Sequence, residues 1–494
     1  MTSPRELLDR LEAMGVVPTG VADDSRQVQP GDLFLAYPGD LADGRRYIAD
    51  ALARGAVAVF WQPGGDFNFG QNFPSTVGMA VDALRPLAGP LAHAVYGHPS
   101  EGLSLIAITG TNGKTTISQC LAKAYPKPCA IIGTLGAGFS DALVETGFTT
   151  PEATTLMRYL ARFRADGAVA CALEASSIGI EEGRMNGARV DVAVFTNMTR
   201  DHLDYHGTME AYAQAKKKLF HWPRLRTAII NLDDDFGLQL MRETTAMRVL
   251  GYAIGEQRRD FPALVRAENL VDTPFGQRFS LVLPNGRAMV DTGLVGRYNV
   301  SNLLAVAAVL HDAGVQASEV ARRLSELTPP PGRMERVGGN GEPLVVVDYS
   351  HTPDALENAL GALRPVAISR GGKLSVVFGC GGDRDPGKRP QMGEVAERLA
   401  DRAIVTSDNP RSEQPQTIID AIVAGMANAE VEADRALAIR RAVLEADERD
   451  VVLLAGKGHE NYQEISGVRQ HFSDVEEAAA ALALRRPNPK EEAA

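Results

Sequence analysis

A glycine-rich segment carries the clearest chemistry in this sequence. Residues 108–116 read Ile-Thr-Gly-Thr-Asn-Gly-Lys-Thr-Thr, after an apolar run and before a helical pattern. Glycines let backbone N–H groups converge on phosphate oxygens, and a helix N-terminus adds positive potential. We expect Lys114 to reach the outer phosphates of a nucleotide and Thr115 to bind Mg²⁺. The strict Walker spacing needs a glycine where Ile108 stands, so an ordinary glycine-rich turn is the alternative.

Polar side chains also follow two other apolar runs. Glu174 comes directly after one of them, and residues 196–207, with two acids and two histidines between Arg200 and Gly207, follow the run that ends at Phe195. An open α/β sheet places its chemistry at the C-terminal ends of its strands. We therefore expect a site at 196–207 and a metal ligand at Glu174.

The alternation of short apolar runs and helical patterns predicts the strands and helices that position these residues. The alternation predicts an α/β protein with a doubly wound parallel sheet in the middle of the chain and a second open α/β sheet after it. A small α/β unit precedes both, with a helix at 7–11, strands at 33–36 and 56–60, and a helix that opens at 43 and runs through 53. Residues 279–286 predict a hairpin. Three prolines make 328–332 the strongest linker candidate. Later strands are predicted at 103–108, 130–132, 169–173, 190–195, 227–230, 344–347, 374–378, 402–406 and 451–454.

Composition narrows the class of protein. The 494 residues carry a net charge of −11, which disfavours a nucleic-acid-binding surface but leaves room for a local basic pocket. No apolar stretch is long enough for a membrane span, and the N-terminus does not resemble a signal peptide. The cysteines at 120, 129, 171 and 380 are scattered, so we expect reduced thiols in a cytoplasmic protein.

These segments together resemble the Mur ligase family. The glycine-rich loop, Glu174 in EASS, NMTRDHLDYHG, Lys216, GRME at 332–335 and DYSHTP at 348–353 occur in family order. The resemblance covers nearly the whole chain. It implies three domains: a UDP-sugar-binding domain at 1–98, an ATP-binding domain at 99–331 and a Rossmann-like, amino-acid-binding domain at 332–494. DNPR at 408–411 and GKGHE at 456–460 resemble the member that adds meso-2,6-diaminopimelate, not lysine.

That resemblance implies an ATP-dependent amide-bond-forming ligase. Its reaction phosphorylates the γ-carboxylate of D-glutamate in UDP-N-acetylmuramoyl-L-alanyl-D-glutamate, and the amine of the incoming amino acid then attacks the acyl phosphate, in peptidoglycan precursor synthesis. The implied partners are these small molecules, with no nucleic acid and no membrane, and we expect a monomer. The ATP-binding residues implied are Gly110, Thr111, Asn112, Gly113, Lys114, Thr115, Thr116, Asn302 and Arg333.

The family also carries metal ions and a modified lysine. The matching metal ligands are Thr115, Glu174 and His202, with Lys216 as a CO₂-derived carbamate that would hold a second Mg²⁺; Lys114, Lys216 and His202 are the catalytic residues implied. Forming a carbamate needs a neutral amine, and lysine shifts its pKa readily when buried. The alternative for Lys216 is a solvated helix lysine, because Lys217 and Lys218 adjoin it.

Acceptor-binding residues match less completely. Those implied are Ser25, Thr149, Thr150, Ser176 and Arg184. Three neighbours depart from the family pattern: Phe148 replaces Asn, Ile178 replaces His, and Glu182 replaces Gln. A carboxylate at 182 would repel an anionic substrate unless it points away.

Seven positions match the family's diaminopimelate pocket: Arg384, Asp408, Asn409, Pro410, Arg411, Gly456 and Glu460. Arginines can clamp the distal carboxylate bidentately, and Glu460 can accept from an ammonium. The alternative for 408–411 is an ordinary turn, which Asn-Pro favours in any case.

Two other functions remain open. A folylpolyglutamate-synthase type of ligase shares a similar loop but normally lacks the N-terminal unit and DNPR, and a nucleotide-hydrolysing switch would not need the arginine-rich C-terminal unit. Because the ligands of one reaction are assigned to three domains, we expect the C-terminal domain to close over the central one, with 328–332 as the hinge region.

Overall fold

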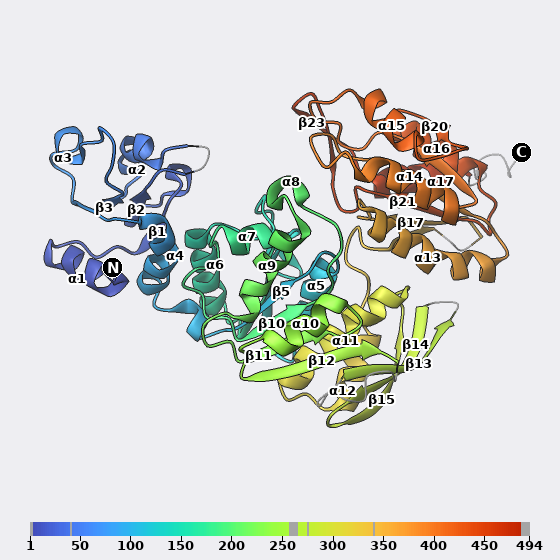
Figure 1. Ribbon diagram of the computed structural model, residues 1–494, viewed down its shortest axis with the longest axis horizontal. Coiled ribbons are helices and arrows are strands. Elements are labelled where there is room, and N and C mark those ends of the chain that lie inside the picture. The colour runs from blue at the N-terminus through green and yellow to red at the C-terminus, as the bar shows by residue number, and fades with distance from the viewer. Residues whose placement is uncertain (1–2, 40–41, 256–264, 274–275, 339–340, 486–494) are drawn as a thin grey trace, which may run out of the picture.

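Three α/β units follow one another along the chain in the computed structural model (Figure 1). The structure describes residues 3–39, 42–255, 265–273, 276–338 and 341–485. The predicted α/β class is confirmed. Within the described residues, no helix is long and apolar enough to cross a membrane.

The first unit is built on a four-stranded parallel sheet in the order β1-β2-β3-β4. Its strands are β1 (Gly20–Ala22), β2 (Asp32–Ala36), β3 (Ala58–Trp61) and β4 (Gly78–Ala80). Its helices are α1 (Pro4–Ala13), α2 (Ile48–Ala53), α3 (Phe69–Asn72) and α4 (Leu84–Val95), with 3₁₀ turns at Ser25–Gln27, Gly44–Tyr47 and Pro99–Glu101. The helix expected from residue 43 is therefore a 3₁₀ turn followed by α2.

Arg158 fixes this unit to the next one. Its guanidinium donates to Asp32 Oδ2 at 2.9 Å, to the Val21 carbonyl at 3.1 Å and to the Gln27 carbonyl at 3.0 Å. Arg158 lies on α6 (Ala153–Ala165) of the second unit. Thr154, on the same helix, donates to Asp23 Oδ1 at 2.7 Å. The first sheet is thus held to one helix by charged and polar contacts.

The second unit contains an eleven-stranded sheet in the order β15-β14-β13-β12-β11-β10-β5-β9-β6-β7-β8. The strands from β13 to β6 in this order are parallel, whereas β14, β15, β7 and β8 pair antiparallel. The expected parallel sheet is therefore extended by hairpins at both edges. The strands are β5 (Ser104–Thr109), β6 (Cys129–Gly133), β7 (Gly136–Phe139), β8 (Ala142–Val144), β9 (Ala170–Glu174), β10 (Val192–Phe195), β11 (Thr227–Asn231), β12 (Arg248–Ile254), β13 (Val265–Thr273), β14 (Gly276–Leu283) and β15 (Gly286–Thr292).

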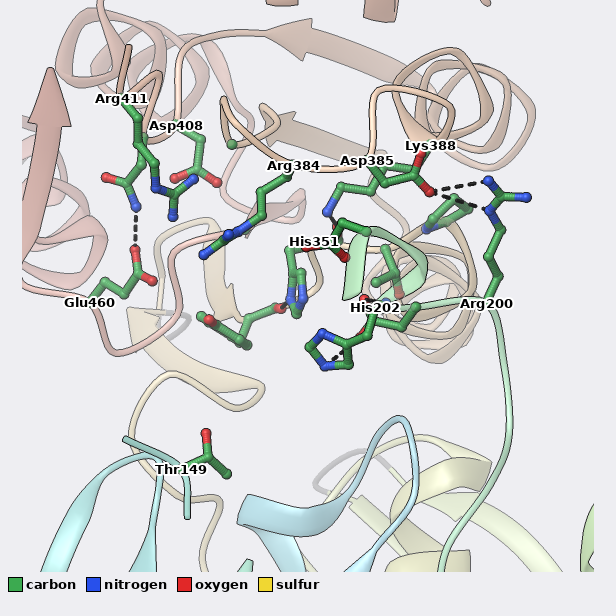
Figure 2. A pocket seen from close by; sticks show the side chains of 18 of the residues that line it. Thr149, Arg200, His202, His351, Arg384, Asp385, Lys388, Asp408, Arg411 and Glu460 are labelled. Carbon is green, nitrogen blue, oxygen red and sulfur yellow. Dashed lines mark hydrogen bonds and ion pairs between the residues drawn. The ribbon is translucent and has the colours of Figure 1, made fainter. Parts of the chain in front are cut away.

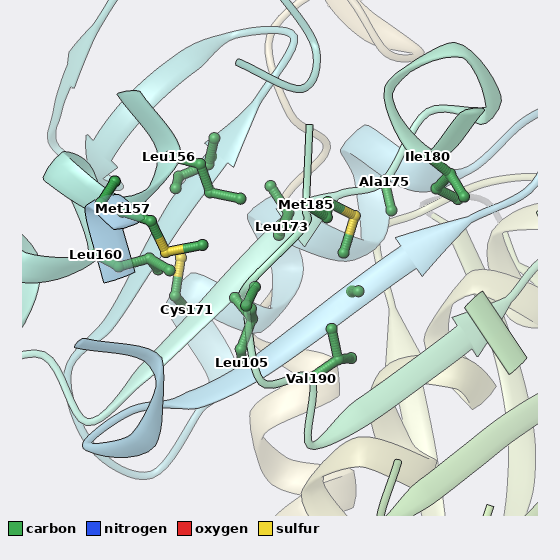
Figure 3. Packing of buried hydrophobic residues seen from close by; sticks show 14 of the residues in the cluster. Leu105, Leu156, Met157, Leu160, Cys171, Leu173, Ala175, Ile180, Met185 and Val190 are labelled. Carbon is green, nitrogen blue, oxygen red and sulfur yellow. The ribbon is translucent and has the colours of Figure 1, made fainter. Parts of the chain in front are cut away.

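Helices cover both faces of this sheet. Successive residues of β5 enter different cores: Leu105 joins the cluster that includes Leu156 and Met157 of α6 (Figure 3), whereas Ile106 packs with residues of α5 and α11. Burial on both faces explains the continuous apolar run in the sequence. The helices are α5 (Lys114–Ala124), α6, α7 (Ser177–Glu181), α8 (Leu203–His206), α9 (Met209–Phe220), α10 (Asp235–Glu243), α11 (Arg297–Asp312) and α12 (Ala317–Ser325).

The third unit is the expected second sheet, with six strands in the order β16-β17-β21-β18-β19-β20. All pairs are parallel except β16 with β17. The strands are β16 (Glu335–Gly338), β17 (Leu344–Asp348), β18 (Leu374–Phe378), β19 (Arg402–Val405), β20 (Glu430–Val431) and β21 (Val451–Ala455), and a separate hairpin joins β22 (Tyr462–Ile465) to β23 (Val468–His471). The helices are α13 (Pro353–Arg370), α14 (Lys388–Leu399), α15 (Pro415–Val423), α16 (Arg435–Glu445) and α17 (Asp474–Arg485).

Candidate active site

The glycine-rich loop joins β5 to α5 at the C-terminal edge of the central sheet. Two of its glycines have no room for a side chain. A Cβ on Gly110 would lie 1.8 Å from Thr196 Oγ1, and a Cβ on Gly113 would lie 2.4 Å from Asn302 Oδ1, at backbone φ angles of +147° and +90°. The loop therefore needs glycine for both space and conformation.

Lys114 begins α5 and folds back over this loop. Its Nζ donates to the carbonyl oxygens of Gly110 and Thr111, both at 2.8 Å. Burial lowers the pKa of Lys114 because it disfavours the charged form of the amine. An anionic partner would stabilise that charged form. The arrangement holds a partly buried ammonium group against the glycine-rich turn.

Glu174 ends β9 and is completely buried beneath the loop. Its carboxylate accepts hydrogen bonds from the hydroxyls of Thr115 at 3.0 Å, Ser118 at 3.2 Å and Thr134 at 3.0 Å. The Glu174 carboxylate and the Thr115 hydroxyl are hard oxygen donors in contact, which suits Mg²⁺.

Lys216 is only 1% exposed, so the solvated lysine considered from the sequence is ruled out. Its Nζ donates to the Gly110 carbonyl at 3.0 Å and lies 4.3 Å from the ring centroid of Tyr212. Burial, followed by the charge of Lys114, holds the pKa of Lys216 well below its usual value. A neutral amine at this position can react with CO₂.

His202 follows β10 and adopts a left-handed backbone conformation just before α8. Its ring Nε2 lies 3.5 Å from Asp201 Oδ2. Partial burial lowers the pKa of His202, which favours the neutral imidazole that a metal ion binds. Among the described residues, no three His, Cys, Asp or Glu side chains gather into a metal cluster, so a metal at this site would also need the Thr115 hydroxyl or another ligand.

A cavity of about 300 Å³ adjoins the glycine-rich loop between the second and third units. It brings together five of the predicted ATP-binding residues: Asn112, Gly113, Thr116, Asn302 and Arg333. Arg333 spans the two units, because its Nη2 donates to Thr115 Oγ1 at 3.3 Å and its guanidinium lies 4.5 Å from the Tyr349 ring. Asn112 also donates to Asp354 Oδ2 of α13 at 3.2 Å.

A second cavity, of about 460 Å³, lies between the two units (Figure 2). Thr149 and His202 line its central-unit side. The other side is formed by residues that follow the parallel strands of the third sheet, as the rule for open α/β sheets requires. From that side it contains His351 after β17, Arg384 after β18, Asp408, Asn409 and Arg411 after β19, and Gly456 and Glu460 after β21.

Charges on the third-unit side face this cavity. Arg411 Nη1 donates to the Gly382 carbonyl at 2.7 Å, and the described residues provide no carboxylate that forms an ion pair with Arg411 or Arg384. Asn409 Nδ2 donates to Glu460 Oε2 at 2.7 Å. Burial, followed by Asp408, raises the pKa of Glu460. This part of the cavity thus offers the guanidinium groups of Arg384 and Arg411 and the carboxylates of Asp408 and Glu460 to one ligand.

Three of the acceptor residues predicted from the sequence, Thr150, Ser176 and Arg184, form a cluster beside the larger cavity's Thr149. Thr150 Oγ1 donates to the Glu174 carbonyl at 2.7 Å and lies 3.0 Å from Ser176 Oγ. Ser176 also caps α7 by accepting from the Gly179 N–H at 3.0 Å. Ser25 is buried in the first unit and lines neither cavity.

Arg184 in this cluster is already paired. Its guanidinium contacts Glu182 Oε2 at 2.6 and 2.7 Å and Glu152 Oε1 at 3.3 Å, and it lies 5.3 Å from the Phe148 ring. The Glu182 carboxylate therefore does not point away: it neutralises the arginine expected to meet an anionic acceptor.

Several residues of the site carried no prediction of their own. His351 lines the larger cavity, and Tyr349 and Asp354 line the smaller one. Their signal in the sequence is the polar segment 348–354 directly after an apolar strand, the same rule that located 196–207. Lys457 and Arg435 are buried behind the larger cavity. Lys457 belongs to the segment GKGHE, which also follows an apolar strand, whereas Arg435 begins α16 and left no such signal.

Comparisons with known proteins cover almost the whole chain. Three family descriptions match it: "Mur ligase family, catalytic domain" at 18–87, "Mur ligase middle domain" at 108–310 and "Mur ligase, glutamate ligase domain" at 332–458. The chain is 49% identical to the UDP-N-acetylmuramoyl-L-alanyl-D-glutamate–2,6-diaminopimelate ligase of Chromobacterium violaceum, with 96% of each protein covered. It is also 49% identical to the ligase of the same name from Pseudomonas aeruginosa, covering 93% of this chain and 94% of that one.

Solved structures give the same result. A structure titled with that ligase name has 37% identity, a TM-score of 0.67 and 95% of both chains covered. A MurF ligase from Thermotoga maritima in complex with ADP shares the fold at 19% identity, with a TM-score of 0.67 and 94% of this chain and 98% of that chain covered.

Proposed function

The chain belongs to the Mur ligase family, and from this premise we propose that it adds meso-2,6-diaminopimelate to UDP-N-acetylmuramoyl-L-alanyl-D-glutamate at the expense of ATP. The observation that carries the proposal is the larger cavity. Arg384, Arg411 and Glu460 face it from one side, and Thr149 and His202 face it from the other. The chemistry of a diamino dicarboxylic acid matches that set of charges.

The reaction proceeds in two steps. The γ-carboxylate of the acceptor attacks the γ-phosphorus of ATP, which forms an acyl phosphate and releases ADP. The amine of diaminopimelate then attacks the acyl carbon, phosphate leaves, and the amine loses a proton. Catalysis of both steps is mainly positioning and charge neutralisation.

Lys114 neutralises the transferring phosphoryl group. In the structure its Nζ donates hydrogen bonds to two loop carbonyl oxygens, and the phosphate oxygens of ATP would replace these two acceptors. The backbone of residues 110–116 cradles the phosphates, and Asn302 and Arg333 lie in the adjoining cavity for the rest of the nucleotide.

Mg²⁺ would be held by the Thr115 hydroxyl and Glu174, whose oxygens lie in contact, with His202 as a further ligand. Bound there, the ion supplies positive charge between the phosphates. Lys216 would bear a CO₂-derived carbamate, which changes a buried cation into an anion. Its burial and depressed pKa support this assignment.

Diaminopimelate would bind through both of its ends. Arg411 and Arg384 meet a carboxylate, and Glu460 and Asp408 meet an ammonium group. On the acceptor side, Thr149, Thr150, Ser176 and Arg184 lie between the cavity and the first unit, where Ser25 would contact the uridine end. We assign these roles to the three domains at 1–98, 99–331 and 332–494, with the hinge at 328–332.

The direct test is ADP release with defined substrates. We expect release to require both the UDP-sugar dipeptide and diaminopimelate. Stimulation by folate and glutamate would instead support a folylpolyglutamate synthase, and release with neither substrate would support a nucleotide switch. The product is checked by its mass.

A further inference from the structure

Lys457 is a completely buried cation behind the larger cavity. Its Nζ lies 3.1 Å from Asn409 Oδ1, 3.4 Å from Glu460 Oε2 and 3.6 Å from Asp408 Oδ1. Two aromatic rings, Tyr462 at 5.6 Å and Phe472 at 5.9 Å, lie on its other sides. Its charge is therefore directed at the residues that line the cavity, and it does not line the cavity itself.

Local backbone geometry directs this side chain inward. Lys457 lies between Gly456 and Gly458, which have φ angles of +117° and +53°. A Cβ on Gly456 would lie 2.8 Å from Asp408 Oδ2, and one on Gly458 would lie 2.8 Å from the Gly332 carbonyl. The turn is compact because both flanking residues lack side chains, and the Lys457 side chain within it is completely buried.

Two carboxylates depend on this cation. Asp408 Oδ1 is buried and accepts no hydrogen bond from the described residues, and the Lys457 ammonium 3.6 Å away compensates its charge, with the buried Arg435 as a further cation that interacts with Asp408. Glu460 Oε2 accepts from Asn409 and contacts Lys457. Two like charges close together would otherwise favour protonation of one of them.

We propose that Lys457 is a positioning residue for the incoming amino acid: it holds Asp408 and Glu460 in place so that both present acceptors to an ammonium group in the cavity. This inference rests on the proposed function. It assigns to Lys457, the central lysine of GKGHE, a role in recognising the amino acid that does not require Lys457 to contact it.

Asn409 links the same residues to the wall of the cavity. Its Oδ1 accepts from Lys457 Nζ and from the Glu464 N–H at 3.0 Å, and its Nδ2 donates to Glu460. The β22–β23 hairpin is therefore attached to the same cluster, and Tyr462 of that hairpin lines the cavity. Removing the charge at 457 loosens one connected network.

Replacing Lys457 with Met removes the charge but keeps a similar length, and replacing it with Gln also keeps a donor for Asn409. With ATP and acceptor saturating, we expect KM for diaminopimelate to rise roughly 10- to 100-fold in either variant, with kcat changed far less. The KM values for ATP and acceptor should stay within about twofold. Lys373→Met, at an exposed lysine of the same unit, is the matched control.

The pH profile separates positioning from mere packing. The groups that act on Glu460 are Asp408, Lys457, Tyr349, Tyr462 and Arg435, and Arg384 and Arg411 line the same side of the cavity. Losing Lys457 removes the cation that lowers the pKa of Glu460, so the carboxylate becomes protonated at higher pH. The acid limb of kcat/KM for diaminopimelate should move upward by about one pH unit.

Either variant decides the question if only one of them folds, as judged by its Tm and its KM for ATP. An unchanged acid limb, or an equal rise in the KM values of all three substrates, overturns the inference. Failure of the proposed function shows itself separately, because diaminopimelate would then give no ADP release in the wild-type protein.

Discussion

The central unit and the C-terminal wall of the larger cavity manage positive charge in different ways. In the central unit, Lys114 and Lys216 bind carbonyl oxygens of the chain itself, and Arg184 is paired with two carboxylates. On the C-terminal wall, Arg411 binds one neutral carbonyl and faces the cavity with Arg384. The central cations must exchange an internal partner for a ligand, whereas the C-terminal arginines are ready to receive one.

The largest effect is expected in the central unit, at the glycine-rich loop. Lys114→Ala should abolish ATP-dependent ligation, with a loss of about a thousandfold or more, because the transferring phosphoryl group loses its neutralising charge. The fold should persist, since the Lys114 Nζ bonds only loop carbonyls. Steady-state product formation measures the loss of activity, and Tm measures the stability of the fold. Near-normal turnover would contradict the role given to Lys114.

Lys216→Arg tests whether a central cation is converted into an anion. Arginine keeps the positive charge but does not form a carbamate, so activity should nearly vanish. In the wild type, native mass analysis should find the mass of one CO₂ on Lys216, lost in acid because protonation of the amine competes with carboxylation. Lys217→Arg, on the neighbouring partly exposed lysine, is the control. Full activity of Lys216→Arg would show that ligation does not depend on a negatively charged carbamate at position 216.

Arg411→Ala tests the C-terminal wall of the larger cavity. A charge-assisted contact to a carboxylate is worth roughly 2–4 kcal/mol, so KM for diaminopimelate should rise about 30- to 1,000-fold while the ATP and acceptor constants barely change. Lysine lacks the distal carboxylate and should lose far less, so the ratio of kcat/KM values for diaminopimelate and lysine should fall toward one. Equal weakening of both amino acids would contradict the assignment. Arg411→Lys should recover part of the loss.

The smallest effect is expected at Arg184, and it has the opposite sign. Glu182→Gln leaves the shape of the cluster but removes one of the two carboxylates that pair with the arginine. We expect KM for the acceptor to fall a few-fold, since a charge pair at a partly exposed site is worth about 1 kcal/mol or less. Glu181→Gln, which releases only Lys218, is the control. A rise in acceptor KM would mean that Glu182 positions Arg184 for binding.

The sequence predicted the site best where one local pattern decides both structure and chemistry. Strand, glycine turn and helix are adjacent in the chain, so the loop around Lys114 could be located from the sequence. The burial of Lys216 could not, because its partner Gly110 is 106 positions away and two further lysines suggested a solvated surface.

Elements without a periodic pattern were missed. The short strand β7 is Gly136-Ala137-Gly138-Phe139, and β23 is exposed along its length, so neither shows the alternation by which a half-buried strand is recognised. Lys457 was quoted within a motif, but only its burial and its contacts with Asn409, Asp408 and Glu460 show that its side chain turns inward.

Because Arg158 fixes the first unit to the second, the distance between these two units can select a ligand by its length. Because four hydrogen bonds from this one guanidinium attach β1, β2 and their neighbours to α6, the separation between Ser25 and the phosphate loop is set when the chain folds. A ligand anchored at both ends must match that span. Selection by length does not need a side chain that recognises the middle of the ligand. Positions such as Phe148 and Ile178 can therefore differ from the family pattern.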